Sequence, residues 1–213
     1  MGFVSSVNVA VLSTGDWTGR VGKSGIDKRP ASGPVLFTES GVAGDTVCDT
    51  EHHGRWFQAV YSFDAEELDF WSGELGKGLV PGNAGENLTL TGCESTDAVI
   101  GERWAVGGAV LRVTGPRVPC RVFAGFWDVG RLVKRFTERG RTGAYLAVER
   151  SGEVRADDEV RLVSRPEHGV TVAEVFALQF HSRPEQADHV AGCLPDLPEP
   201  WRERVAAKID SAA

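Results

Sequence analysis

The sequence predicts a mainly β protein, a barrel or a sandwich, with a small helical extension at its C-terminal end. Three observations carry this prediction. The 213 residues include 26 glycines and 10 prolines, which indicates many turns and therefore short strands. Apolar and polar residues alternate over several short segments, which is typical of strands. Helical spacing of apolar residues dominates only after Val163.

Composition narrows the class of protein. Hydrophobic residues make up 41% and charged residues 25%, as in a globular domain. The net charge of -7 offers no basic footprint, so we expect no binding of nucleic acid. No apolar stretch approaches ~20 residues and no signal-peptide pattern is present. We therefore expect no membrane span and a cytoplasmic location.

Nine strands are expected along the chain. The two glycines Gly107 and Gly108 separate two of them and predict a hairpin, and Ser151 and Gly152 predict a turn. The expected strands cover residues 3–12, 34–37, a short part of 41–47, 88–90, 98–100, 103–106, 109–114, 144–149 and 159–164.

Helical spacing predicts two helices within the β-rich part and three beyond it. The first covers residues 63–75 and has Ser62 or Asp64 as its candidate N-cap. The second covers 128–139 and ends at Gly140. The last three cover 172–180, 184–190 and 199–209. We therefore divide the chain into a β-rich domain at 1–168 and a helical extension at 169–213.

The most informative segment for chemistry is Pro116-Arg117-Val118-Pro119-Cys120-Arg121. Its two prolines stiffen the backbone. An arginine on each side of Cys120 favours the thiolate, the form that attacks electrophiles and ligates metals. A buried structural cysteine explains the same features equally well. The other cysteines, Cys48, Cys93 and Cys193, form no CxxC pair, so we expect neither a zinc ribbon nor an iron–sulfur cluster.

Other polar residues could bind a ligand. Asn87, in Gly85-Glu86-Asn87-Leu88-Thr89, can donate and accept hydrogen bonds, although a turn-capping asparagine is the simpler interpretation. His52 and His53 are adjacent and would not share one face of a strand. The pairs Lys23-Ser24 and Lys28-Arg29 lie in a glycine-rich loop that could hold a phosphate, without the spacing of a P-loop. A solvated basic loop is the alternative.

In chain order these segments resemble the MOSC domain family, the sulfurase C-terminal domain of molybdenum-cofactor proteins. Within that family they are most similar to bacterial stand-alone proteins that reduce N-hydroxylated bases such as 6-hydroxylaminopurine. The matching segments cover nearly the whole chain. They are Lys23-Ser24-Gly25-Ile26, Lys28-Arg29-Pro30, Gly41-Val42-Ala43-Gly44-Asp45, His53-Gly54, Gly85 to Thr89, Ile100-Gly101-Glu102, Pro116 to Cys120, Gly140-Arg141-Thr142-Gly143-Ala144-Tyr145-Leu146, Gly152 to Val163, and the tail with Trp201-Arg202.

The resemblance implies a MOSC-type β-barrel with peripheral helices. It also implies that Cys120 ligates molybdenum or carries sulfur. The cofactor would be molybdopterin, and no flavin or iron–sulfur cluster is expected in the chain. The residues that the resemblance places at the cofactor are Lys23, Ser24, His53, Glu86, Asn87, Cys120, Arg117 and Arg121.

The function implied is a molybdenum-dependent reduction of a small N-hydroxylated substrate to an amine. A separate protein would donate the electrons, and the oligomeric state is open, a homodimer included. The main alternative is a metal-free sulfur carrier with a Cys120 persulfide. A non-catalytic cofactor-binding module and a cysteine hydrolase are further alternatives.

One segment departs from the family pattern. The family continues its histidine motif as His-Gly-Gly-Pro-Asp-Arg/Lys-Ala-Val, whereas this chain has His53-Gly54-Arg55-Trp56-Phe57-Gln58-Ala59-Val60. We expect Arg55 to offer a new contact to an anion. We expect Trp56 and Phe57 to offer a stacking surface for a planar substrate.

Overall fold

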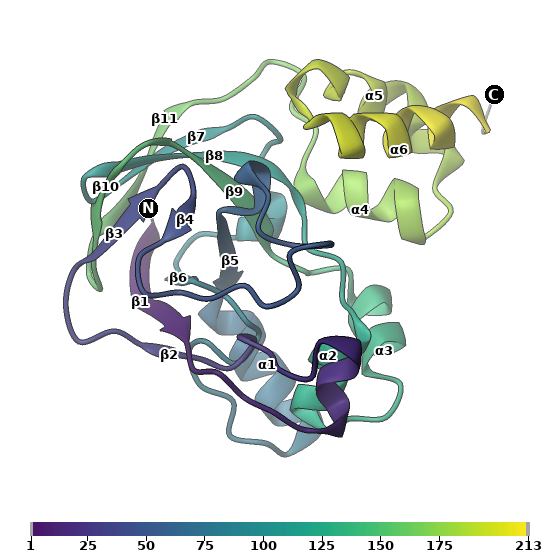
Figure 1. Ribbon diagram of the computed structural model, residues 1–213. Coiled ribbons are helices and arrows are strands. Elements are labelled where there is room, and N and C mark those ends of the chain that lie inside the picture. Colours follow the sequence, from purple (N-terminus) through teal and green to yellow (C-terminus); the bar gives the residue numbers. More distant parts are fainter. Residues whose placement is uncertain (1, 212–213) are drawn as a thin grey trace.

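Seven strands form a closed β-barrel in the computed structural model, which describes residues 2–211 (Figure 1). The order around the barrel is β11-β7-β8-β9-β5-β6-β1, and pairing of β1 with β11 closes it. Strand β2 (Lys28–Pro30) extends the sheet at the end of β1. The barrel strands are β1 (Gly2–Ala10), β5 (Val60–Asp64), β6 (Leu88–Thr91), β7 (Arg103–Val106), β8 (Ala109–Pro116), β9 (Ala144–Arg150) and β11 (Glu159–Ser164).

A small second sheet lies beside the barrel. It has the order β10-β3-β4 and is antiparallel throughout. Its strands are β3 (Val35–Thr38), β4 (Gly41–Val42) and β10 (Gly152–Val154).

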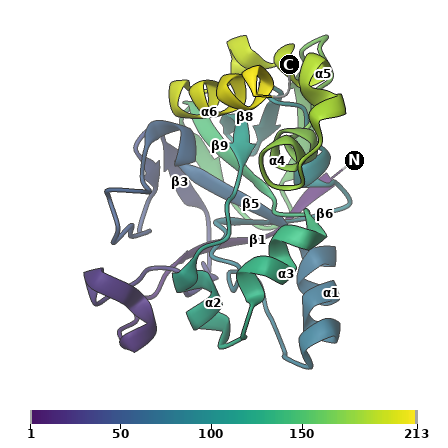
Figure 2. The same cartoon turned by 90° about the vertical axis from the view of Figure 1, so that its right-hand side faces the viewer.

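The α-helices form two groups at opposite ends of the barrel (Figures 1 and 2). One group is α1 (Ala65–Leu75), α2 (Arg121–Trp127) and α3 (Leu132–Arg139), with the 3₁₀ segment η1 (Asp16–Val21) beside α2. The other is α4 (Val172–Phe180), α5 (Ala187–Ala191) and α6 (Glu199–Asp210). Short 3₁₀ turns connect the rest: η2 (Trp56–Gln58), η3 (Ser95–Asp97), η4 (Pro184–Gln186) and η5 (Leu194–Asp196).

Two buried clusters hold these layers together. The larger one joins the inside of the barrel to α4, α5 and α6, for example through Leu111, Val175 and Trp201. The smaller one is aromatic and packs α1, α2 and α3 against β5. Its rings are in contact: the centroids of Phe123 and Phe136 lie 4.9 Å apart. Burial of large side chains of this kind is a main source of stability.

The barrel with peripheral helices confirms the predicted fold class. The hairpin at Gly107 and Gly108 is confirmed, since Val106 pairs with Ala109. The helix predicted at 172–180 has those bounds. The division of the chain into two parts at residue 168 stays a prediction. Apolar residues of α4, α5 and α6 belong to the same buried cluster as the barrel strands, so the two parts share one core.

Four local predictions were wrong. Residues 98–100 form only an isolated bridge between Val99 and Thr171. Residue 152 begins strand β10 and is not confined to a turn. The expected helix 128–139 starts at Leu132, because Asp128 and Arg131 have positive φ angles of 51° and 60° and interrupt it. Residues 63 and 64 belong to strand β5, which pairs in parallel with β6.

None of the helices within residues 2–211 is long and apolar enough to cross a bilayer.

Candidate functional site

Cys120 lies where β8 has ended and α2 begins. Its backbone is extended (φ −128°, ψ 172°) at the position just before the first residue of α2. The side chain is half-buried and packs against the aromatic cluster under α1, α2 and α3. Pro116 at the end of β8 and Pro119 just before Cys120 restrict the intervening backbone. The segment therefore presents its thiol from a restrained backbone against a packed aromatic surface.

Arg117 is a buried cation without a carboxylate partner among residues 2–211. Its exposed fraction is 4%. The guanidinium carbon lies 4.0 Å from the ring centre of Phe123 and 5.7 Å from that of Tyr61. The Nη1 group is buried and has no hydrogen-bond partner in this part of the chain. Aromatic faces stabilise a cation in part, but a buried charge is normally paired and hydrogen-bonded. The site thus has an N–H donor left for an anionic ligand.

His53 and Tyr145 share the electrostatic environment of Arg117. Burial lowers the pKa of His53, the Asp49 carboxylate opposes this, and the positive charge of Arg117 lowers the pKa further. Burial raises the pKa of Tyr145, the charge of Arg117 opposes this, and Cys120 adds a smaller upward effect. Near pH 7 the His53 ring is therefore neutral and the Tyr145 hydroxyl keeps its proton. Arg117 therefore acts electrostatically on both His53 and Tyr145, and Cys120 acts on Tyr145.

Asn87 belongs to a buried polar network behind this group. Its Nδ2 donates to Asp45 Oδ2 (2.8 Å) and to the carbonyl of Asn8 (3.3 Å). Its Oδ1 accepts from the Tyr61 backbone N–H (3.2 Å). The Asp45 carboxylate also forms a buried ion pair with Lys28. Both donors of the Asn87 amide are therefore used within the protein, and only acceptor capacity at Oδ1 is left for a ligand.

Glu86 holds the loop that precedes β6. Its Oε1 accepts from Gly82 N (2.6 Å) and Thr89 Oγ1 (2.7 Å), and its Oε2 accepts from Ala84 N (3.0 Å). Burial raises the pKa of Glu86 to about 7, although these three hydrogen bonds act in the opposite direction. The carboxyl group faces its own loop, so its contribution to the site is to fix the loop that carries Asn87.

The basic loop next to α2 is only partly free. Lys23 is exposed, whereas Ser24 is buried and its Oγ accepts from Ile26 N (3.2 Å). Segment η1 packs on α2, where the rings of Trp17 and Phe126 lie 5.7 Å apart. Lys28 is buried and forms an ion pair with Asp45. Of the pair Lys28-Arg29, which the sequence suggested as a phosphate contact, only Arg29 is therefore exposed.

The remaining site prediction, Arg121, is exposed as the first residue of α2. Two residues in the neighbourhood were given no role from the sequence. Tyr145 and Asp45 both lie in segments that carry the family resemblance, so those motifs could have indicated them. Their roles depend on contacts between segments that are far apart in the chain, which the sequence does not state.

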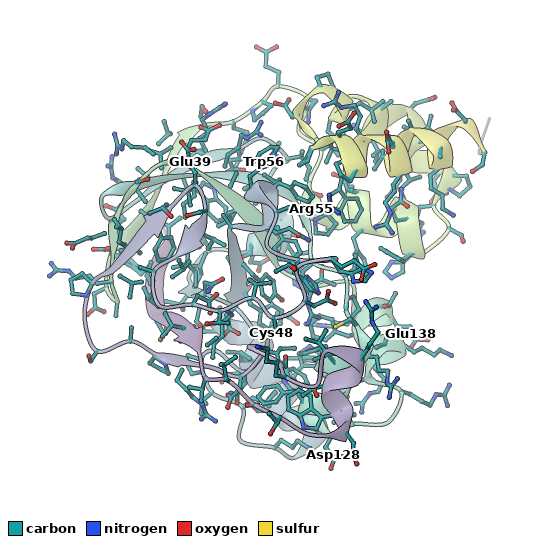
Figure 3. The ribbon with its side chains drawn as sticks, viewed as in Figure 1. Glu39, Cys48, Arg55, Trp56, Asp128 and Glu138 are labelled. Atoms are coloured by element: carbon teal, nitrogen blue, oxygen red, sulfur yellow. The ribbon has the colours of Figure 1, made fainter. Side chains whose placement is uncertain are left out.

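Three residues of the segment that departs from the family pattern, Arg55, Trp56 and Phe57, line a groove whose lining does not include Cys120. Arg55 and Trp56 lie on the side of the barrel that faces the C-terminal helices (Figure 3). Trp56 is 54% exposed, as the expected stacking surface requires. Phe57 is 6% exposed and packs in the barrel core, so the expectation that it adds to the stacking surface was wrong.

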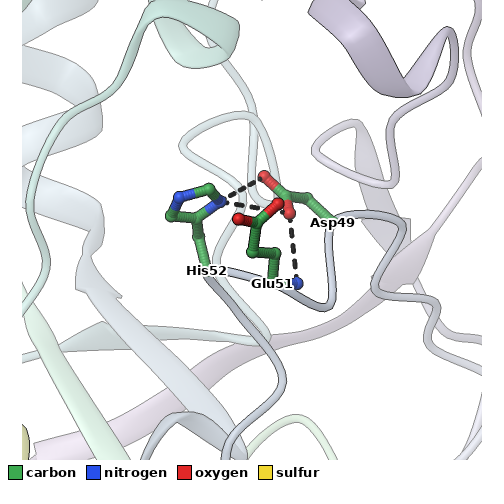
Figure 4. A group of neighbouring side chains, drawn as sticks. All are labelled: Asp49, Glu51 and His52. Atoms are coloured by element: carbon green, nitrogen blue, oxygen red, sulfur yellow. Dashed lines mark hydrogen bonds and ion pairs between the residues drawn. The ribbon is translucent and has the colours of Figure 1, made fainter.

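An exposed cluster of Asp49, Glu51 and His52 precedes this segment (Figure 4). Asp49 Oδ2 and His52 Nδ1 lie 3.1 Å apart. Burial alone would raise the pKa of Asp49, but the hydrogen bond and charge of His52 outweigh it and hold that pKa below its usual value. Glu51 forms an ion pair with Arg20 of η1. We interpret the cluster as a surface ion-pair network that links this loop to η1.

Comparisons with known proteins cover nearly the whole chain. A family model, MOSC domain, matches residues 49–161. The chain is 31% identical over 209 residues to the uncharacterized protein YflK of Bacillus subtilis (strain 168), over 97% of this chain and 94% of that protein. The crystal structure of YiiM from Geobacillus stearothermophilus superposes with a TM-score of 0.80 at 25% identity, over 98% of this chain and 100% of the other.

A third relative is longer. The chain is 30% identical over 147 residues to a protein named Reductase from Gibberella moniliformis (strain M3125 / FGSC 7600). The match covers 67% of this chain and 26% of that protein, so it spans about a quarter of the longer sequence.

Proposed function

Because the chain belongs to the MOSC domain family, we propose that it binds the molybdenum cofactor through Cys120 and reduces N-hydroxylated compounds to amines. The family is associated with this cofactor, and the similarity to a protein named Reductase supports a reductive activity. One observation carries the proposal: the half-buried Cys120 thiol lies near a buried Arg117 whose Nη1 has no hydrogen-bond partner among residues 2–211.

The residues present fit the cofactor chemically. A cysteine thiolate is a soft ligand of the kind that sulfur-ligated metals prefer. The pterin part of the cofactor carries a phosphate, and Arg117 offers a buried N–H donor together with an uncompensated positive charge. Lys23, just after η1, and Arg121, the first residue of α2, are exposed cations and would meet the more solvated part of such a group.

The side chains around Cys120 would also control protons. The neutral His53 ring can accept a proton at an imidazole nitrogen, and the nearby charge of Arg117 favours its release. Tyr145 retains its hydroxyl proton and can donate a hydrogen bond to a substrate oxygen. Asn87 and Glu86 act one step further out, because they fix the loop and strands behind the site.

The cofactor, when bound, supplies the two electrons that convert an N–O bond into an amine and water. The chain's own task is to bind the substrate, orient its N–O group and deliver protons. We expect electrons to reach the site from a separate protein, because no flavin or iron–sulfur motif occurs in the sequence. The substrate is a small molecule with an N-hydroxyl group.

The test is metal analysis of protein made in a host that produces molybdenum cofactor. We expect molybdenum in the native protein and its loss in Cys120→Ala. The matched control is Cys93→Ala, which removes another half-buried thiol at a surface groove that does not include Cys120. The control variant should retain the metal, and the loaded native protein should reduce an N-hydroxylated purine when a chemical reductant supplies electrons.

Two results would count against the proposal. Absence of molybdenum from the native protein, in a host that loads other molybdenum enzymes, would remove its basis. Metal retained in Cys120→Ala would show that this thiol is not the ligand. A sulfur adduct on Cys120, found by mass spectrometry of metal-free protein, would instead support the sulfur-carrier alternative.

A further inference from the structure

A groove separate from Cys120 lies between the barrel and the C-terminal helices. Its volume is about 560 Å³, within the usual range for small-molecule sites. One wall comes from Arg55, Trp56 and Phe57, and Arg112 of β8 completes the barrel side. The other wall consists of residues 195–200 and Arg202, around the start of α6. We call this feature the rim groove.

The aromatic part of the rim groove is fixed in place. Trp56 is the most exposed of the six tryptophans, at 54%. Its ring meets the buried Phe57 edge-on, with centroids 5.6 Å apart. The carbonyl of Phe57 accepts a hydrogen bond from Thr114 Oγ1 (2.6 Å), which ties this turn to β8. An exposed indole on an anchored turn is a preorganised surface, so little ordering is needed when a planar ring stacks on it.

The groove is cationic although the chain has a net charge of -7. Its three arginines are Arg55, Arg112 and Arg202, and its two acidic residues are Asp196 and Glu199. The carboxylate of Asp196 faces His168, because its Oδ2 lies 3.4 Å from His168 Nε2. The charge at the groove therefore favours an anion.

Arg112 links the cationic and aromatic features. Its guanidinium carbon lies 5.6 Å from the Trp56 ring centre. Its Nε is 3.3 Å from Glu149 Oε1, and the same carboxylate accepts a closer bond from Arg103 Nε (2.7 Å). One carboxylate thus serves two guanidinium groups, and the buried Nε of Arg112 has no hydrogen bond within residues 2–211. Positive charge remains beside the exposed indole.

We propose that the rim groove is a second binding site, for a planar aromatic molecule that carries an anionic group. The ring would stack on Trp56, and the carboxylate or phosphate would meet the guanidinium groups of Arg55 and Arg112. Cys120 does not line the groove, so this site does not depend on the cofactor proposal. Arg55 and Trp56 come from the segment that departs from the family pattern.

The probe is adenosine 5′-monophosphate, titrated into the full-length protein by calorimetry. Adenosine and inorganic phosphate serve as partial probes. We expect saturable binding of the nucleotide at one site, with each partial probe at least about tenfold weaker. Trp56→Leu and Arg112→Gln should each weaken nucleotide binding by about tenfold, and Arg112→Lys should weaken it less because it keeps the charge. Binding should also protect Trp56 fluorescence from acrylamide quenching.

The matched control is Arg204→Gln. Arg204 also lies over a tryptophan, with its guanidinium carbon 5.7 Å from the ring centre of Trp201, but that ring is buried and outside the groove. This variant and Cys120→Ala should bind the nucleotide as the native protein does. The proposal is overturned if the nucleotide does not bind saturably, if inorganic phosphate binds as tightly, or if Trp56→Leu and Arg112→Gln bind it unchanged. Loss of binding in Cys120→Ala would place the nucleotide at the thiol and overturn it as well.

Discussion

At the scale of single residues, polar side chains divide into those the fold uses and those it leaves free. Lys28 and Asn87 are the clearest cases of the first kind, since both are buried and bond to Asp45 of the loop after β4. Arg117 is the clearest case of the second, because its buried Nη1 has no partner among the described residues. A buried donor costs free energy when it is left unpaired, and this is the reason that we propose Arg117 as a contact for the ligand.

The pKa of His53 can be used to test whether the charge of Arg117 lies close to its ring. In Arg117→Met the positive charge that helps to lower the pKa of His53 is lost, so that pKa should rise toward 6.5, its ordinary value. Titration of the His53 ring by NMR would measure it. Arg121→Met removes an exposed charge instead and should leave the His53 titration unchanged. An unchanged His53 pKa in Arg117→Met would show that the two side chains do not interact.

At the scale of elements, the side chain of Asp64 at the junction of β5 and α1 bonds to a distant segment and does not cap the helix. Asp64 occupies the N-cap position of α1, as its sequence context suggested, but its side chain makes no capping bond. Instead Oδ1 accepts from Ser95 N (2.9 Å) and Ser95 Oγ (2.7 Å) of η3. Its Oδ2 is buried without a partner among the described residues. The residue therefore joins two distant segments, and burial raises its pKa to about 7.

This raised pKa makes stability depend on pH in a defined direction. Between pH 3.8 and about 7 the folded protein keeps a proton on Asp64 that the unfolded chain has lost. The stabilisation is therefore full below that range and is lost as the pH rises through it, by on the order of 4 kcal/mol. Asp64→Asn should remove this contribution. Urea unfolding at a series of pH values would measure the free energy of unfolding.

A carboxyl two residues further on, in the first turn of α1, provides the control. Glu66 accepts hydrogen bonds from Thr91 Oγ1 and Gly92 N, and these outweigh its burial and lower its pKa. Glu66→Gln should therefore change stability only at acid pH, as the pH falls through the values where this group takes up a proton. If the free energy of unfolding of Asp64→Asn still falls as the pH rises above 3.8, then Asp64 is not the group that causes this pH dependence.

At the scale of the whole molecule, one apolar cluster extends from the barrel into the C-terminal helices. Val175 of α4 and Trp201 of α6 belong to the same cluster as the barrel strands. Trp201 also lies over β8, where a Cβ placed on Gly115 would be 3.1 Å from its Nε1. Removing apolar contacts in the C-terminal helices should therefore destabilise the barrel strands as well as the helices.

Val175→Ala should lower the free energy of unfolding by about 2 kcal/mol, because it leaves a cavity at a fully buried position. Hydrogen exchange should report this loss in both α4 and β8. The matched control is Val163→Ala, whose side chain is 55% exposed and whose truncation should cost much less. Faster exchange in α4 with unchanged protection in β8 would mean that the helical extension unfolds on its own.

Much of the fold and the main candidate for the site could be predicted from local pattern. Alternation identified β7, β8 and the hairpin between them, and helical spacing identified α4. The stiff segment around Cys120 was recognised because proline and arginine flank the thiol. These features depend on neighbours within a few residues, which the sequence displays directly.

Only the tertiary structure decided which polar residues remain available to a ligand. Strand β5 exists because it pairs in parallel with β6 and antiparallel to β9, although helical spacing begins within it. Lys28 and Asp64 look like surface residues in sequence, yet distant partners take them into the interior. Hydrogen bonds and burial between segments far apart in the chain set these outcomes, so local propensity could not reveal them. By itself the sequence predicted a barrel or a sandwich, the resemblance to the family and Cys120 as the candidate site residue. Folding determined which polar groups lie around that thiol and which are used within the protein.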